Sequence, residues 1–174
     1  MDATQLAATH GSPCGGPLPE LEVPMINTLV RCLSSEHRRL NEYILQLALA
    51  ATRLASHPSE LAANAQAVEA WDKIRRELGS HLQIEDELVF SWAAARQAIS
   101  PTLLDTLKVE RREIRKLMAA LIELLSSEDR EPESVANDGI FAQKLMGLTQ
   151  NLDAHIERYD AEVLPSILRA VFRG

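Results

Sequence analysis

Four segments of the chain carry apolar residues at alternating steps of three and four, which places them on one face of an α-helix. These lines of apolar residues fall within residues 26–54, 71–92, 104–125 and 145–163. Runs of β-branched residues and hairpin turns are scarce between them, whereas Ala, Leu, Glu, Gln and Arg dominate. The pattern therefore predicts an all-α protein in which four long helices each bury one face.

Proline marks the expected ends of these helices. Pro24, Pro58, Pro101 and Pro132 follow one another at spacings comparable to the length of one long helix and its connection. Proline is tolerated in the first turn of a helix and disfavoured inside it, so each of them can open a helix. Ser100, directly before Pro101, is an expected N-cap. Short connections make successive helices antiparallel, which predicts an up-down-up-down antiparallel four-helix bundle.

The chain of 174 residues divides into two parts. Residues 1–23 contain three prolines and three glycines and are predicted to form a flexible Gly/Pro-rich tail. Residues 24–174 are predicted to form the four-helix bundle, and this length is sufficient for one hydrophobic core.

Each apolar line contains polar residues near its middle. His37 lies in the first, His81 and Glu85 in the second, Arg111 in the third and His155 in the fourth. An uncompensated buried charge costs several kcal/mol, so these residues need a reason to face the core. Metal coordination is one, because central side chains of facing helices converge on the bundle axis. Imidazole and carboxylate together suit iron, zinc or manganese better than calcium or magnesium.

The polar positions also follow an internal repeat. Residues 36–40 (EHRRL) align with residues 110–114 (ERREI), and at the same offset His81 aligns with His155. In the second copy, Arg111 replaces the first copy's His37, and tyrosine stands where the first copy has Glu85. The repeat therefore predicts a site with two related halves, of which the second has changed.

The stretches EHRRL, HLQIEDELVF and HIERYDAEVLP resemble the hemerythrin-like HHE cation-binding domain family over roughly residues 25–168. That family is a four-helix bundle in which a histidine or a His-x3-Glu pair from each helix holds two bridged iron ions. Carried over residue by residue, the resemblance implies that His37, His81, Glu85 and His155 are metal ligands.

Two positions depart from the family pattern. Arg111 stands at the third-helix histidine and cannot ligate, because its guanidinium stays protonated. Tyr159 stands at the fourth-helix glutamate; its phenolate can bind ferric iron but cannot bridge two ions as a carboxylate does through its two oxygens. Asp160, five residues after His155, resembles the His-x4-Asp arrangement of oxygen-carrying hemerythrins and is a candidate replacement, as is Glu110. The predicted metal ligands are therefore His37, His81, Glu85, His155, Tyr159 and Asp160.

Three functional interpretations stay open. The first is an altered metal site that holds iron, as one or two ions with at most one firmly bound, and zinc or manganese less readily. The resemblance then implies binding or sensing of iron, dioxygen, nitric oxide or peroxide. The second is a metal-free interaction or regulatory module in which Arg111 replaces the cation and forms a two-pronged ion pair with Glu85, beside a hydrogen-bonded Tyr159. The third and least favoured is an oxygen-activating enzyme with two metal ions, because no residue identifies a substrate.

Composition narrows the partners and the compartment. A formal net charge of −7 argues against a nucleic-acid partner, which would require a concentrated basic face. The chain has no run of 18 apolar residues and no basic start followed by an apolar run, so no membrane association is expected. Its two cysteines form no Cys-x-x-Cys pair, which fits the expected cytoplasmic location. A protein partner is not specified by the sequence.

Overall fold

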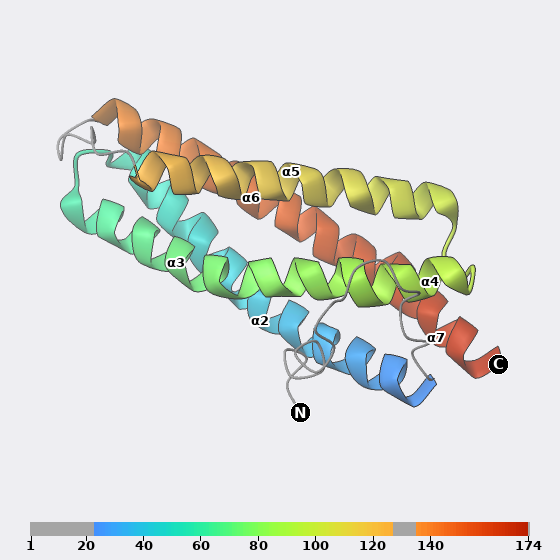
Figure 1. The fold of residues 1–174 in the computed structure, drawn as a ribbon. Coiled ribbons are helices and arrows are strands. Elements are labelled where there is room, and N and C mark those ends of the chain that lie inside the picture. Colours follow the sequence, from blue (N-terminus) through green and yellow to red (C-terminus); the bar gives the residue numbers. More distant parts are fainter. Residues whose placement is uncertain (1–22, 127–134, 174) are drawn as a thin grey trace.

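The computed structural model describes residues 23–126 and 135–173 (Figure 1). The predicted tail, residues 1–23, lies outside the described residues except for the backbone of Val23. All long elements of the described part are helical, and it contains no strand. The elements are α2 (Val23–Ser56), α3 (Leu61–Ile84), η1 (Glu85–Phe90), α4 (Ser91–Ala95), α5 (Pro101–Ser126), α6 (Val135–Arg158), η2 (Tyr159–Val163) and α7 (Leu164–Arg173).

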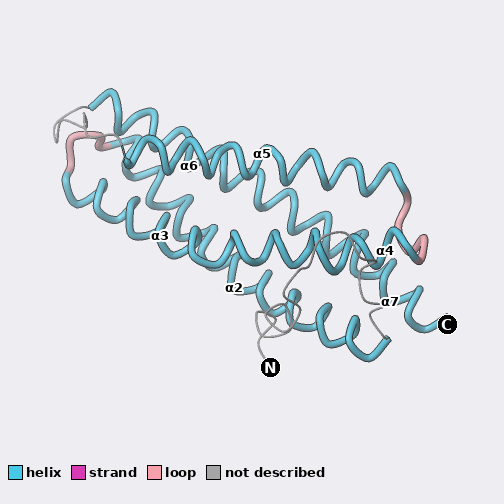
Figure 2. The backbone as a smooth tube through the Cα atoms, in the orientation of Figure 1, coloured by secondary structure: helices cyan, strands magenta, loops and turns pink. Residues whose placement is uncertain are grey.

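These elements form four long helical segments, here called rods, that run side by side. The first rod is α2 and the third is α5. The second rod joins α3, η1 and α4, and the fourth joins α6, η2 and α7, without an intervening loop. Successive rods alternate in direction, and short loops join the first three of them at opposite ends of the bundle (Figures 1 and 2). The predicted all-α, up-down-up-down four-helix bundle is confirmed. None of the described helices is both long and apolar enough to cross a membrane.

The rods do not pack equally closely. Helix α2 packs against α3 and α6, and α5 packs against α6, whereas close approaches between α3 and α5 are few. The buried apolar residues form two clusters, one around Trp71 and Phe141 and the other around Ile26 and Ile167. Along α2, Leu33 belongs to the second cluster and Leu40 to the first. The buried polar residues therefore form a layer, here called the polar layer, between two apolar cores. This layer contains His37, His81, Glu85, Arg111 and His155.

The two π-helical segments were not predicted. Segment η1 begins at Glu85 and η2 begins at Tyr159, so the same irregularity recurs at aligned positions of the internal repeat. A π turn contains one more residue than an α turn and rotates the residues that follow. Val89 and Phe90 are therefore buried, whereas Leu88, expected on the inward face, is only partly buried. Segments of this kind are frequent at functional sites.

The helix starts follow the predicted signals only in part. Ser100 Oγ accepts a hydrogen bond of 3.2 Å from the backbone N–H of Leu103, which confirms Ser100 as a cap of α5. Pro58 lies in the connection before α3, whose first residue is Leu61, so it does not occupy the first turn. Pro132 lies outside the described residues.

Candidate metal centre

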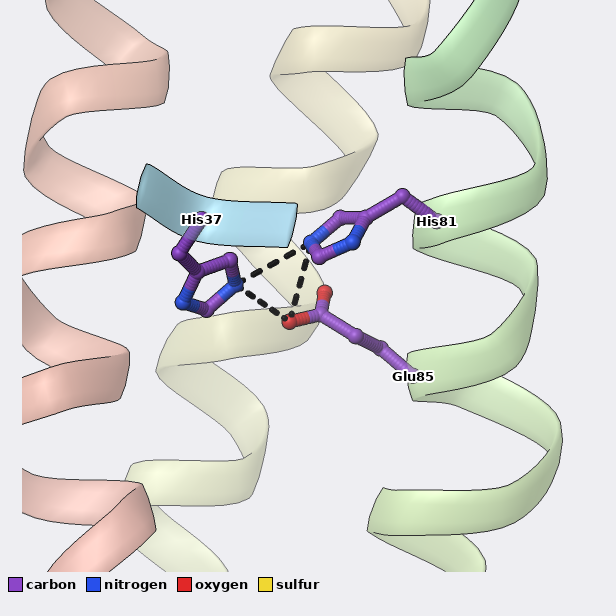
Figure 3. Close-up of side chains that lie close together, drawn as sticks. All are labelled: His37, His81 and Glu85. Atoms are coloured by element: carbon purple, nitrogen blue, oxygen red, sulfur yellow. Dashed lines mark hydrogen bonds and ion pairs between the residues drawn. The ribbon is translucent and has the colours of Figure 1, made fainter. Parts of the chain in front are cut away.

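Three buried side chains from the first two rods point toward one another in the polar layer (Figure 3). His37 Nε2 on α2 lies 3.1 Å from His81 Nε2 on α3. Glu85 Oε1, at the start of η1, lies 3.5 Å from the first of these nitrogens and 3.6 Å from the second. The three potential ligand atoms all lie within 4.8 Å of one another. Together they form a group that could hold one metal ion.

The fourth rod adds His155 to this group. Its Nε2 lies 3.0 Å from Glu85 Oε2, so the carboxylate has histidines at both of its oxygens. His155 is 1% exposed and Glu85 is completely buried. The structure therefore brings His37, His81, Glu85 and His155 to one place.

The ring nitrogens that face away from the centre, Nδ1 of His37, His81 and His155, are hydrogen-bonded as well. Three carboxylates accept hydrogen bonds from Nδ1: Asp160 from His37 at 3.1 Å, Glu36 from His81 at 2.9 Å and Glu110 from His155 at 3.4 Å. A carboxylate only accepts, so each Nδ1 must carry the hydrogen, which leaves Nε2 as the nitrogen that faces the centre. This carboxylate–imidazole arrangement is the one that orients histidine ligands toward metals. The alignment of Glu36 with Glu110 in the repeat was the sequence signal for it.

Asp160 and Tyr159, both predicted as ligands, take different positions. The Asp160 side chain is 48% exposed and contacts His37 from outside the centre. The Tyr159 ring packs edge-on against the His37 ring, with 4.6 Å between centroids. Its hydroxyl is buried and has no hydrogen-bond partner among the described residues. The phenol thus lies beside the centre with an unused polar atom.

Arg111 is buried as expected but does not bind Glu85. Its Nη2 lies 2.5 Å from Asp86 Oδ1, and its guanidinium covers the Phe90 ring at 4.1 Å. The predicted two-pronged Arg111–Glu85 ion pair with a hydrogen-bonded Tyr159 is therefore wrong. The histidines already surround the Glu85 carboxylate. The guanidinium of Arg111 therefore pairs with the carboxylate of the neighbouring Asp86. Nε and Nη1 of Arg111 have no acceptor among the described residues.

The contacts of the two halves follow the internal repeat. Arg111 contacts Asp86, and His37 contacts Asp160. In the repeat Arg111 aligns with His37, and Asp160 aligns with Asp86. The second half therefore keeps the scaffold of the first but presents a permanent cation where the first presents an imidazole.

The pKa values reflect this concentration of charge. Burial lowers the pKa of His81 and of His155, but Glu85 and the outer carboxylates raise both to about 9. Burial raises the pKa of Glu85, and the facing His155 and His81 outweigh it, so the net shift is well below the usual value. Burial, followed by the charges of Glu85 and Asp160, raises the pKa of the Tyr159 phenol. Near neutral pH, His81 and His155 are therefore protonated in the absence of metal.

The residues fit a transition-metal ion on the chemistry of their atoms. Glu85 Oε1 is buried, ionised and without a hydrogen-bond partner among the described residues. An unsatisfied buried acceptor costs about 1–3 kcal/mol, and more when it is charged. A cation held by His37, His81 and Glu85 would satisfy this oxygen and replace the protons between the imidazoles.

The fold is a helical bundle, and its centre contains a His/Glu group that could hold a metal ion. Residues 19–167 match the family described as the hemerythrin HHE cation binding domain. Because the match spans most of the chain, the protein belongs to the hemerythrin HHE cation-binding domain family, and the resemblance seen in the sequence is confirmed. Neither the search of curated proteins nor the search of solved structures gave a match.

Proposed function

We propose that the protein binds one transition-metal ion, iron in preference to zinc or manganese, through His37, His81, Glu85 and His155. The observation that carries this proposal is the shared orientation of the three imidazoles. Each has its outer nitrogen on a carboxylate and its inner nitrogen at the centre. Such outer carboxylates typically fix the tautomer of a ligating histidine. A cytoplasmic location stays a prediction of the sequence.

The restriction to one ion follows from the second half of the layer. Arg111 keeps its charge at any working pH, although burial lowers its pKa. Tyr159 offers a single oxygen, so it cannot bridge two ions as a carboxylate does through its two oxygens. A second metal ion would therefore lie close to a fixed positive charge and lack a second bridging carboxylate besides Glu85, and we expect it to be excluded.

A bound iron would supply reversible binding of dioxygen, nitric oxide or peroxide, so we propose a role in binding or sensing such ligands rather than in catalysis. The Tyr159 hydroxyl is the residue of this chain placed to take part, because it is buried beside His37 without a partner among the described residues. It can donate a hydrogen bond to a small ligand or, as phenolate, bind ferric iron. Asp160 keeps His37 oriented from outside.

A metal-free interaction or regulatory module is the second candidate. Two observations favour it: Arg111 has its own counterion and ring partner, and His81 and His155 each contact a carboxylate that can neutralise a protonated imidazole. In that case iron would neither bind nor stabilise the fold, and function would depend on a protein partner.

Substituting Glu36 tests the observation on which the metal proposal rests. Glu36→Gln keeps the size of the side chain but removes the charged acceptor of His81 Nδ1. We expect iron affinity to fall about 10–100-fold, the usual effect of losing such a partner. Competition with a chelator of known affinity measures it. Glu42→Gln on the exposed face of α2 is the control and should bind as the wild type does; equal affinities of all three proteins would contradict the proposal.

Tyr159→Phe tests whether the phenol binds iron. If it does, the ferric protein should show a visible phenolate-to-iron absorption band that the variant lacks, because only the hydroxyl has been removed. Absorption spectra of both proteins at equal iron content give the comparison. Identical spectra would remove Tyr159 from the set of ligands and leave it as a hydrogen-bond donor.

A further inference from the structure

A basic pocket of about 490 Å³ opens on the face of the bundle between η1 and α5. Five of its seven lining residues are cationic and only one is acidic, in a chain whose net charge is −7. The lining residues are Asp86, Lys108, Arg111, Arg112, Arg115 and Lys116, with Ala119. The net charge of the protein has the opposite sign, so this concentration requires an explanation.

The cations of the pocket are incompletely neutralised. Asp86 pairs with both Arg111 and Arg115, so one carboxylate serves two guanidinium groups. Arg111 is 2% exposed, and two of its nitrogens lack an acceptor among the described residues. Arg112 is exposed and forms no ion pair within the described part of the chain. The pocket thus has a buried, unsatisfied cation at its base and a free one at its rim.

The remaining two cations have only weak partners. Lys108 contacts Asp105 at 3.4 Å and Lys116 contacts Glu113 at 2.7 Å, each on the exposed surface of α5 itself. Exposed pairs of this kind contribute little and exchange readily with solvent or with another anion. Both ammonium groups are therefore available to a ligand in the pocket.

The internal repeat shows that the fold does not require this basic face. The first copy carries Ser34, Arg38, Asn41 and Glu42 at the positions that align with Lys108, Arg112, Arg115 and Lys116. Only one of the four is basic in that copy. The same bundle position is thus built without the cluster, so the charge belongs to something other than helix packing.

We propose that this pocket binds a small oxyanion with several negative charges, of the diphosphate class. Its volume lies within the range of about 300–1,000 Å³ that is typical of small-molecule sites. Lys108, Arg112 and Lys116 follow one another at steps of four and extend about 12 Å along α5, enough to contact two linked phosphoryl groups. A guanidinium group can bind two phosphoryl oxygens at once through two parallel N–H groups.

The ligand would also contact the polar layer through Arg111. This residue forms part of the pocket lining, and Glu85 of the metal centre contributes to its pKa. An anion in the pocket would compete with Asp86 for Arg111 and Arg115 and supply acceptors for the unsatisfied nitrogens. The site itself does not depend on a bound metal, so the proposal can be tested separately from metal binding.

Isothermal titration calorimetry of metal-stripped full-length protein with diphosphate tests the proposal. We expect saturable binding at one site per chain that weakens as salt is added, and about tenfold weaker binding for Arg112→Gln, the usual effect of losing one charge-assisted contact. Arg38→Gln, at the matching position of the first copy, should bind diphosphate as the wild type does. Orthophosphate and citrate serve as comparison ligands and should bind more weakly.

Several outcomes would overturn the inference. They are the absence of saturable diphosphate binding at low salt, equal losses in Arg112→Gln and Arg38→Gln, or citrate binding as tight as that of diphosphate. Arg112 is exposed, so we expect Arg112→Gln to fold as the wild type does. Thermal melting of each variant checks this. Iron content measured on separate, iron-loaded samples of the same variants separates a failure of anion binding from a failure of the metal proposal.

Discussion

His81→Ala is expected to reduce the iron content of the reconstituted protein from about one ion per chain to less than about a tenth of that value. The substitution removes the imidazole that faces both His37 Nε2 and Glu85 Oε1. It also leaves Glu36 without the group that it orients. The remaining ligands would then be His37 and Glu85, with His155 next to the other oxygen of Glu85.

Elemental analysis after anaerobic loading and gel filtration gives this content directly. His57→Ala is the matched control, because His57 is an exposed histidine in the connection between α2 and α3, far from the polar layer in sequence. Circular dichroism shows whether each variant keeps its helices. Iron content in folded His81→Ala equal to that of the control would exclude His81 from the site.

Metal affinity is expected to fall about a hundredfold for each pH unit below pH 9, down to about pH 7. His81 and His155 each have a pKa of about 9 in the metal-free protein, and both must lose a proton before Nε2 can bind metal. Binding near pH 7.5 should therefore release about two protons per ion. Chelator competition across this range gives the affinity, and a pH indicator in weak buffer gives the protons. A flat affinity profile would show that metal does not displace protons from these two histidines.

The stability of the metal-free protein should change in the opposite direction. The folded-state pKa of each of these histidines lies above the usual value of 6.5, so the folded protein binds their protons more tightly than the unfolded chain does. Their contribution to the free energy of unfolding is complete below about pH 6.5 and is lost as pH rises through about 9. Melting temperatures of the chelator-treated protein should therefore decline over this interval, whereas the metal-loaded protein should be protected.

The fold could be predicted because its signal is repeated along each helix. The line through residues 26–54 keeps its period for about eight turns, and every residue predicted on it is buried. The convergence of His37, His81, Glu85 and His155 followed from the same geometry, because each lies near the middle of its line. Whether they bind metal stays a prediction.

The partner of Arg111 and the position of Asp160 could not be predicted from spacing. Glu85 and Asp86 are adjacent residues about 100° apart around a helix, and a long arginine side chain can contact either. The π turns then rotate the residues that follow by an amount that no 3.6-residue period reveals. In both halves the acidic residue one position beyond the ligand position contacts the facing rod from outside the centre.

These contacts give a consistent account of the altered half. A site with four helical contributors can lose one imidazole to arginine when a carboxylate outside the centre is available to pair with it, and Asp86 fills that role. The positive charge of the guanidinium then repels a second metal ion. The first half keeps its ligands and the carboxylates that are hydrogen-bonded to them. One half is thus suited to a metal ion and the other to a permanent cation.

The ratio of iron to protein in the reconstituted wild-type chain tests this account most directly. Iron is loaded anaerobically, unbound iron is removed by gel filtration, and both components are quantified in the same fractions. The account predicts about one ion per chain. Two ions per chain would show that Arg111 and Tyr159 do not exclude a second metal, and a chain that holds none would contradict the proposed iron site.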